Sequence, residues 1–166
     1  MKSQRRGSRK LLSALLAGSW AVAAVPARSA PPVSPSPYAG LEARAVKALS
    51  PERREGLLAG SGIGYAMAAE LNGHAGPKHV LELAEQLALT PEQLATASAS
   101  FDRMHAAAVR LGAELVAVEE HLDRRFAHRH LDEALLAKLT ADAAKLEGEI
   151  RFAHLREHLE IDTVLT

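Results

Sequence analysis

The feature that most constrains this chain of 166 residues is a run of apolar and small side chains spaced alternately three and four positions apart. Its members are Leu94, Ala97, Phe101, Met104, Ala108, Leu111, Leu115, Val118 and Leu122. Alternating steps of three and four place every member on one stripe of an α-helix, as in the a and d positions of four coiled-coil heptads. The spacing therefore predicts a long amphipathic helix that buries this stripe against a second element.

The start of this helix is marked by Thr90-Pro91-Glu92-Gln93. Threonine is a good N-cap, proline suits the first helical position, and glutamine three residues after the cap completes a capping box. We expect the helix to end near Ala127, which makes it roughly 55 Å long at 1.5 Å per residue. Gly112 lies inside it and costs about 1 kcal/mol relative to alanine.

A second long helix is predicted after the turn Arg129-His130-Leu131. Asp132 is its N-cap, and Glu133 places a negative charge at the positive end of the helix dipole. Its apolar stripe consists of Leu136, Leu139, Ala143, Leu146, Ile150 and Ile161. Because a short connection makes consecutive helices antiparallel neighbours, we expect an all-α protein built on a long antiparallel helical hairpin.

Short helices are expected ahead of this hairpin and packed on it. One covers roughly residues 41–49, and Ser50-Pro51-Glu52 starts the next with a cap, a proline and an acidic residue. The glycines of residues 60–64 interrupt the chain, and a short segment follows to Leu71. Residues 78–89 are predicted to form one more short amphipathic helix. The single helical domain is expected to cover residues 41–166.

The N-terminus is predicted to be an export signal. Positively charged residues 2–10 precede an apolar run of 15 residues, Leu11 to Val25, and small residues follow. A helix of that length spans roughly 22 Å, short of the ~30 Å hydrocarbon core of a membrane. We therefore expect a cleavable signal peptide over residues 1–27 rather than an uncleaved membrane anchor, and a periplasmic location.

Residues 28–40 contain four prolines and interleaved serines, which predicts a disordered tether. The whole chain carries 20 basic and 20 acidic residues, but five of the basic ones and none of the acidic ones precede residue 28. The exported part therefore carries a net charge of about −5, which argues against binding to nucleic acid. The absence of cysteine excludes disulfides, cysteine-ligated metals and a thiol nucleophile.

The export signal, the short helices before a long hairpin and the motif Leu89-Thr90-Pro91-Glu92-Gln93 together resemble the Spy/CpxP family. That family is marked by an LTxxQ motif, usually present twice, and Val164-Leu165-Thr166 stands where the second copy would begin. The resemblance covers roughly residues 41–166. It implies a periplasmic, mostly helical protein without enzymatic activity, which often forms a cradle-shaped dimer.

The resemblance also implies a range of functions. Some members are ATP-independent chaperones for unfolded proteins, one type inhibits a membrane sensor kinase, and a related branch comprises periplasmic heavy-metal sensors and resistance proteins. We expect a homodimeric envelope-stress or metal-resistance protein that binds unfolded or envelope proteins. The alternative is a metal sensor or metal buffer that signals to a membrane-bound sensor or anti-sigma partner.

Histidines are the candidate metal ligands. His154 and His158 are four residues apart, so both project from one face of the second long helix. The hairpin places Asp102 and His105 opposite them, and the four residues predict an N/O site for Zn²⁺, Ni²⁺, Co²⁺ or Cu²⁺. No other cofactor is expected. The alternative is that His154 is part of the apolar seam and His158 lies in solvent.

The metal-sensor branch draws on a helical His-x-x-x-His and on His-x-x-x-Met in its last long helix. In this chain the His-x-x-x-His lies in the last helix, and the predicted helix before the LTxxQ motif, residues 78–89, has only His79. His121, His128 and His130 form a second candidate histidine cluster beside the predicted turn between the long helices.

Residues 154–158 also match the H-x-x-E-H pattern of some zinc peptidases, but a long hairpin provides no substrate cleft, so we do not expect an enzyme. A second apolar stripe, Phe152, Leu155 and Leu159, lies on the opposite side of the last helix. Either the N-terminal helices or a second subunit cover this stripe, or it is an exposed surface for client proteins.

Overall fold

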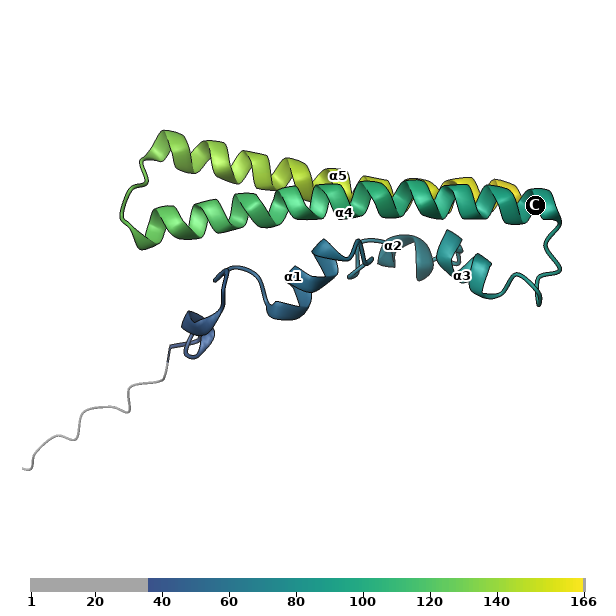
Figure 1. The fold of residues 1–166 in the computed structure, drawn as a ribbon, viewed down its shortest axis with the longest axis horizontal. Helices are drawn as coiled ribbons and strands as arrows, with labels where there is room; N and C mark the ends of the chain where they lie inside the picture. Colours follow the sequence, from purple (N-terminus) through teal and green to yellow (C-terminus); the bar gives the residue numbers. More distant parts are fainter. Residues whose placement is uncertain (1–35, 166) are drawn as a thin grey trace, which may run out of the picture. The chain divides into compact units, whose positions relative to one another are not determined.

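The computed structural model describes residues 36–165, and these are helical, with no β-strand among them. The elements are η1 (Leu41–Ala43), α1 (Pro51–Leu58), α2 (Met67–Glu70), α3 (Pro77–Glu82), α4 (Pro91–Ala127) and α5 (Glu133–Leu165) (Figure 1). The all-α expectation is confirmed for this part of the chain. The predicted export signal and most of the predicted tether lie outside the described residues.

The long helix α4 begins and ends where the sequence predicts. The Gln93 backbone N–H donates to Thr90 Oγ1 at 3.2 Å, and the Thr90 N–H donates to Gln93 Oε1 at 2.9 Å, which completes the capping box. At α5, the Leu135 N–H donates to Asp132 Oδ1 at 2.8 Å. No helix within residues 36–165 is both long enough and apolar enough to cross a membrane.

Helices α4 and α5 lie side by side and run in opposite directions (Figure 1). At the start of α4, Gln93 Nε2 donates to the backbone oxygen of Val164 near the end of α5, at 2.8 Å. The buried stripe comprises Ala97, Met104, Ala108, Leu111 and Leu115 on α4 and Leu139, Leu146, Ile150 and Ile161 on α5. Leu94 is 43% exposed instead, because α5 ends beside the first turn of α4.

Helix α1 crosses α4 at Gly112. A Cβ atom on Gly112 would lie 2.1 Å from the backbone oxygen of Leu57, so only glycine permits this contact. The approach buries Leu57 and Val116, and Val116 lies outside the predicted stripe. The glycine therefore determines where the N-terminal part of the domain sits on α4.

Two predicted helices are shorter than expected. Residues 41–49 contain only the 3₁₀ turn η1, because so short a segment does not sustain an α-helix unaided, and local turns direct Val46 and Leu49 into the core. Helix α3 ends at Glu82 rather than Leu89. The chain turns there, with Ala88 in the left-handed region at φ 49°, and so reaches the cap of α4.

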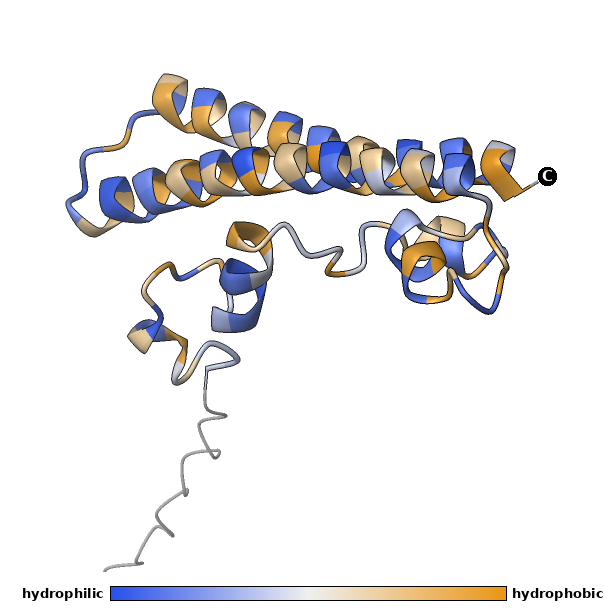
Figure 2. Ribbon diagram, turned by 45° about the vertical axis from the view of Figure 1, so that its right-hand side comes forward, coloured by the Kyte–Doolittle hydropathy of each residue, from blue (hydrophilic) through white to orange (hydrophobic). Residues whose placement is uncertain are grey.

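Figure 2 shows apolar and polar residues alternating along both long helices, as expected for amphipathic elements. The loop after α1 is more irregular. Gly60, Ile63 and Gly64 all have positive φ, at 64°, 34° and 89°. Such a value is rare for a β-branched residue, and strained backbone often borders a binding site.

Candidate functional site: a histidine pocket

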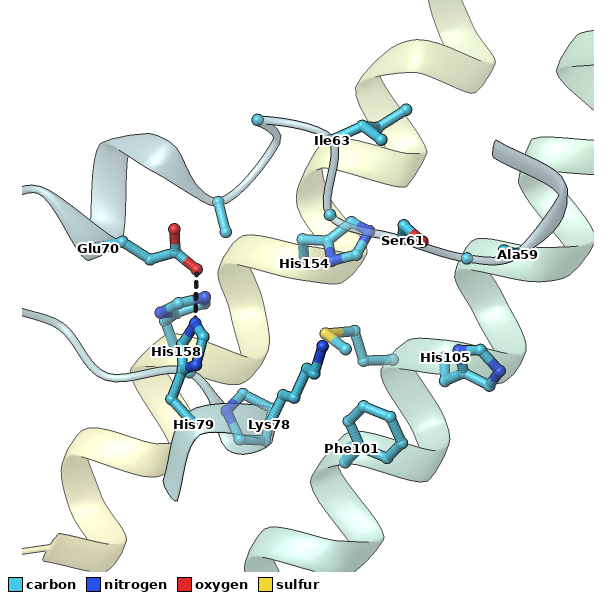
Figure 3. Close-up of a pocket in the computed structure, with 17 residues that line it drawn as sticks. Ala59, Ser61, Ile63, Glu70, Lys78, His79, Phe101, His105, His154 and His158 are labelled. Atoms are coloured by element: carbon cyan, nitrogen blue, oxygen red, sulfur yellow. Dashed lines mark ion pairs between the residues drawn. The ribbon is translucent and has the colours of Figure 1, made fainter. Parts of the chain in front are cut away.

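A cavity of about 410 Å³ lies between the irregular loop after α1, the α2–α3 segment and the two long helices (Figure 3). Phe101 and Met104 of α4 form part of its apolar wall. Its titratable lining residues are Glu70, Lys78, His79, His105, His154 and His158. The cavity, which we call the histidine pocket, therefore gathers half of the chain's eight histidines.

His154 of α5 is buried in the wall of the histidine pocket, with 2% of its surface exposed. Its ring stacks on Tyr65 with centroids 5.9 Å apart, and its buried Nε2 has no hydrogen-bond partner. Burial lowers the pKa of His154, the neighbouring His158 lowers it further, and Glu70 opposes both. These effects favour the neutral form of the ring, and the protein leaves its buried Nε2 without a hydrogen-bond partner.

The Tyr65 ring, on which His154 stacks, is itself held in place by hydrogen bonds. The Tyr65 hydroxyl donates to Glu147 Oε2, and Arg53 Nη2 donates to Glu147 Oε1 at 2.6 Å. Burial and the Glu147 carboxylate raise the pKa of Tyr65 to about 12, so this hydroxyl keeps its proton. His154 therefore rests on a fixed surface and has little freedom to turn toward another partner.

His158, one turn further along α5, is also buried, so the expectation that it lies in solvent is wrong. The loop before α3 folds over it, and its Nδ1 lies 3.0 Å from the backbone oxygen of His74. Since a carbonyl only accepts, Nδ1 is the donor in this contact. A Cβ atom on Gly76 would lie 2.8 Å from Cε1 and 3.0 Å from Nε2 of this ring.

Glu70 and His79 face these two histidines from the α2–α3 segment. Glu70 Oε1 lies 3.7 Å from His79 Nε2, and both side chains are about half exposed (Figure 3). Sequence reasoning did not find Glu70, because no helical spacing relates it to α5. In the sequence, the turn residues Asn72, Gly73 and Gly76 mark the turn between α2 and α3 but do not indicate where Glu70 will lie.

Three of the four predicted ligands line one cavity, and Asp102 does not. His105 lies in the wall contributed by α4, stacked on Phe101 with centroids 5.6 Å apart. Asp102 is exposed and is not among the lining residues. Within residues 36–165 no three His, Asp or Glu side chains already converge closely enough to hold a metal ion.

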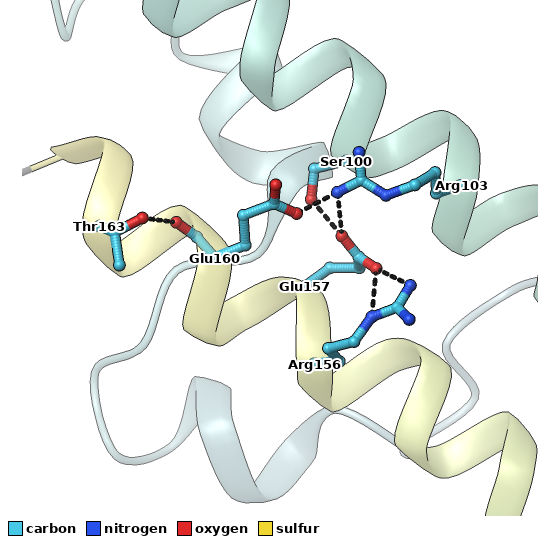
Figure 4. Close-up of polar contacts among 6 residues, drawn as sticks. All are labelled: Ser100, Arg103, Arg156, Glu157, Glu160 and Thr163. Carbon is cyan, nitrogen blue, oxygen red and sulfur yellow. Dashed lines mark hydrogen bonds and ion pairs between the residues drawn. The ribbon is translucent and has the colours of Figure 1, made fainter.

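Glu157 lies between His154 and His158 in the sequence of α5 and is also buried (Figure 4). Its Oε2 accepts from Ser100 Oγ at 2.7 Å and from Arg103 at 2.9 Å, and its Oε1 accepts from Arg156 at 2.5 Å. Burial opposes ionisation, but these hydrogen bonds and the arginine charge lower the pKa of Glu157 to about 2. The glutamate of the H-x-x-E-H pattern thus joins α5 to α4, and both of its oxygens are engaged by Ser100 and arginines rather than by the histidines.

The second apolar stripe of α5 is left uncovered by the described chain. Phe152 is 62% exposed, Leu159 is 65% exposed, and Leu155 is half-buried. The short helices pack chiefly on α4, so they do not provide the cover that was one of the two expectations. The Arg156 guanidinium lies over the Phe152 ring, 5.8 Å from its centroid.

No family model, curated protein or solved structure matches this chain. Its function is therefore inferred from the histidine pocket and the uncovered stripe.

Proposed function

We propose that this chain is a non-enzymatic periplasmic protein of the Spy/CpxP type that binds a divalent transition-metal ion in the histidine pocket. The observation that carries the proposal is the state of His154 and His158. Both rings are buried in the same cavity wall, the buried Nε2 of His154 has no hydrogen-bond partner, and Nδ1 of His158 lies 3.0 Å from the backbone oxygen of His74. Imidazole nitrogens of this kind are ligands for Zn²⁺, Ni²⁺, Co²⁺ and Cu²⁺.

The surroundings of His158 support a ligand role. Metal-binding histidines usually donate the proton of the other ring nitrogen to a carbonyl or carboxylate, which fixes the tautomer and the ring orientation. The bond from Nδ1 to the His74 carbonyl has this form. Gly76 leaves room beside Nε2 that any side chain at this position would fill.

Glu70 and His79 are the proposed additional ligands, in place of Asp102. They lie on the other wall of the pocket, and their partial exposure lets the side chains turn toward α5. A metal ion held by both walls would tie the α2–α3 segment to α5. This link between the α2–α3 segment and α5 would signal the presence of metal to a membrane-bound sensor or anti-sigma partner. Without a partner, the same site would serve as a metal buffer.

Calorimetric titration of the exported chain with Zn²⁺, Ni²⁺, Co²⁺ and Cu²⁺ tests the proposal. We expect micromolar or tighter binding of at least one ion, abolished by His154→Ala and by His158→Ala and weakened by Glu70→Gln. Asp102→Asn is the matched control and should bind as the parent does. Absence of heat with all four ions, or full binding by His158→Ala, would reject the metal site.

The uncovered stripe favours a second candidate, an ATP-independent chaperone for unfolded or envelope proteins. Exposed Phe152 and Leu159 beside Arg156 offer apolar surface and positive charge together on the scaffold of an antiparallel hairpin. Homodimerisation through the stripe is the competing use of this surface.

A client-aggregation assay at substoichiometric protein separates these uses. Suppression of aggregation that is lost in Phe152→Ser/Leu159→Ser but kept in Phe126→Ser, which changes an equally exposed phenylalanine on α4, supports the chaperone. Unaltered aggregation by the parent rejects it. A dimer that the double variant converts to a monomer assigns the stripe to self-association.

A further inference from the structure

A second cavity, of about 280 Å³, lies at the end of α4 beside the loop that leads to α5. Every residue that lines it carries a basic or nitrogen-containing ring side chain: His121, Arg124, Arg125, His128 and His130. The cavity therefore includes all three members of the second histidine cluster that the sequence contains. We call it the basic pocket.

The composition of the basic pocket disfavours a metal cation. Two guanidinium groups share the space with the three imidazoles, and their charge opposes a second positive charge. In addition, Arg125 Nε donates to His121 Nε2 at 2.9 Å, so the lone pair of that ring is already used. His121, His128 and His130, which suggest a metal site in the sequence, thus lie in a pocket whose charge favours an anion.

Of the carboxylates near the basic pocket, only Glu120 pairs with one of its arginines in the described part of the chain. Glu120 interacts with Arg54 at 3.5 Å and with Arg124 at 3.8 Å, Asp123 interacts with Lys47, and Asp132 caps α5. Within the part of the chain that the structure describes, Arg125 has no carboxylate within ion-pair distance. Its bond to His121 also restricts the guanidinium, so less side-chain freedom is lost when a ligand binds.

Helix-dipole effects account for only part of this arrangement. Basic residues in the last turn of a helix offset the partial negative charge there, which explains Arg124 and Arg125. They do not explain why His128 and His130, beyond the end of the helix, lie with ring centroids 6.4 Å apart and line the same cavity as those arginines.

We propose that the basic pocket binds a phosphate group. Arginine presents a planar fork of donors that matches the oxygens of a phosphate, and the imidazoles add donors from the loop side. The phosphate belongs either to a soluble phosphorylated compound or to the headgroup of an anionic phospholipid. The proposal does not depend on metal binding, because none of these residues lines the histidine pocket.

Titration of the full exported chain with inorganic phosphate, followed by NMR of the histidine and arginine side chains, tests the site. We expect saturable shifts confined to residues 121–130 and about a tenfold loss of affinity in Arg125→Gln, which removes a charged donor. Arg110→Gln removes an exposed arginine from the same helix and should leave the affinity unchanged. His154→Ala should also leave it unchanged.

Co-sedimentation with vesicles identifies the source of the phosphate. Binding to vesicles that contain an anionic phospholipid, but not to phosphatidylcholine vesicles, and its loss in Arg125→Gln indicate a headgroup. Phosphate binding without vesicle binding indicates a soluble compound. Absence of saturable shifts together with absence of vesicle binding overturns the proposal, as does an equal loss of affinity in Arg110→Gln, which would indicate diffuse charge.

Discussion

Two buried polar clusters on neighbouring turns of α5 are arranged in opposite ways. Around Glu157, both carboxylate oxygens accept hydrogen bonds from α4 or from Arg156 (Figure 4). Around His154 and His158, a buried ring nitrogen has no partner and the space in front of it is a cavity (Figure 3). A satisfied buried group stabilises the fold, whereas an unsatisfied one costs stability unless a ligand satisfies it.

The largest effect is expected from Glu157→Gln. The substitution leaves Arg103 and Arg156 without their buried partner, and we expect a loss of about 2–3 kcal/mol in the free energy of unfolding, since both arginines are half exposed. Chemical denaturation measures it. Glu160→Gln removes a partly exposed carboxylate that also pairs with Arg103 and should cost less than about 1 kcal/mol. Equal losses would remove the distinction between a buried and an exposed partner.

The stability of the parent protein should also depend on the pH in the acidic range. Because the pKa of Glu157 is lowered from 4.5 to about 2 in the folded state, the unfolded chain binds this proton more readily. Its contribution is therefore complete above pH 4.5 and is lost as the pH falls from 4.5 toward 2. Thermal unfolding across this window should show a smaller pH dependence in Glu157→Gln than in the parent, and an identical dependence would contradict the assignment.

At the histidine pocket, one of two leucine substitutions is expected to raise the free energy of unfolding. His154→Leu removes the unsatisfied buried nitrogen, and without metal it should raise the free energy of unfolding by about 1 kcal/mol. His158→Leu removes the bond to the His74 carbonyl and should lower it by about 1 kcal/mol. Both variants should lose metal binding. Denaturation of the two metal-free variants measures the difference, and a less stable His154→Leu would show that this ring is structural.

The last prediction concerns Gly76→Ala and is measured as affinity, because the φ of −93° at Gly76 is accessible to alanine and the expected effect arises at the His158 ring. The new Cβ atom would press on the His158 ring and should weaken metal binding about tenfold. Gly62→Ala, in the same cavity wall but with no atom within 4 Å of a Cβ, is the matched control. Calorimetry with the preferred ion compares them, and equal affinities would place the metal away from His158.

The parts of the fold that were predicted from the sequence are those set by local chemistry. The Thr90 and Asp132 caps and the end of α4 at Ala127 follow from side chains within a few residues of each boundary. Residues 41–49 and the end of α3 were predicted incorrectly, because the first segment is too short to sustain an α-helix unaided and the chain turns after Glu82 to reach the cap of α4. The close contact at Gly112 has no local signal beyond the glycine itself.

The same distinction applies to the candidate site, where residues related by helical spacing were predicted and those positioned by tertiary packing were not. The pair His154 and His158 follows from helical spacing, and His105 follows from the expected approach of α4 to α5. Glu70 could not be found, because it depends on how the α2–α3 segment folds onto α5. The burial of His158 has the same origin, since the residues that cover it come from the loop before α3.

The length of α4 has an electrical consequence. About 20 residues of helix separate His105 in one pocket from Arg125 in the other, or roughly 30 Å at 1.5 Å per residue. Counterions screen exposed charges beyond about 8 Å at physiological ionic strength. A divalent cation at one pocket and a phosphate dianion at the other would therefore be insulated from each other, and the chain could titrate each ligand independently of the other's concentration.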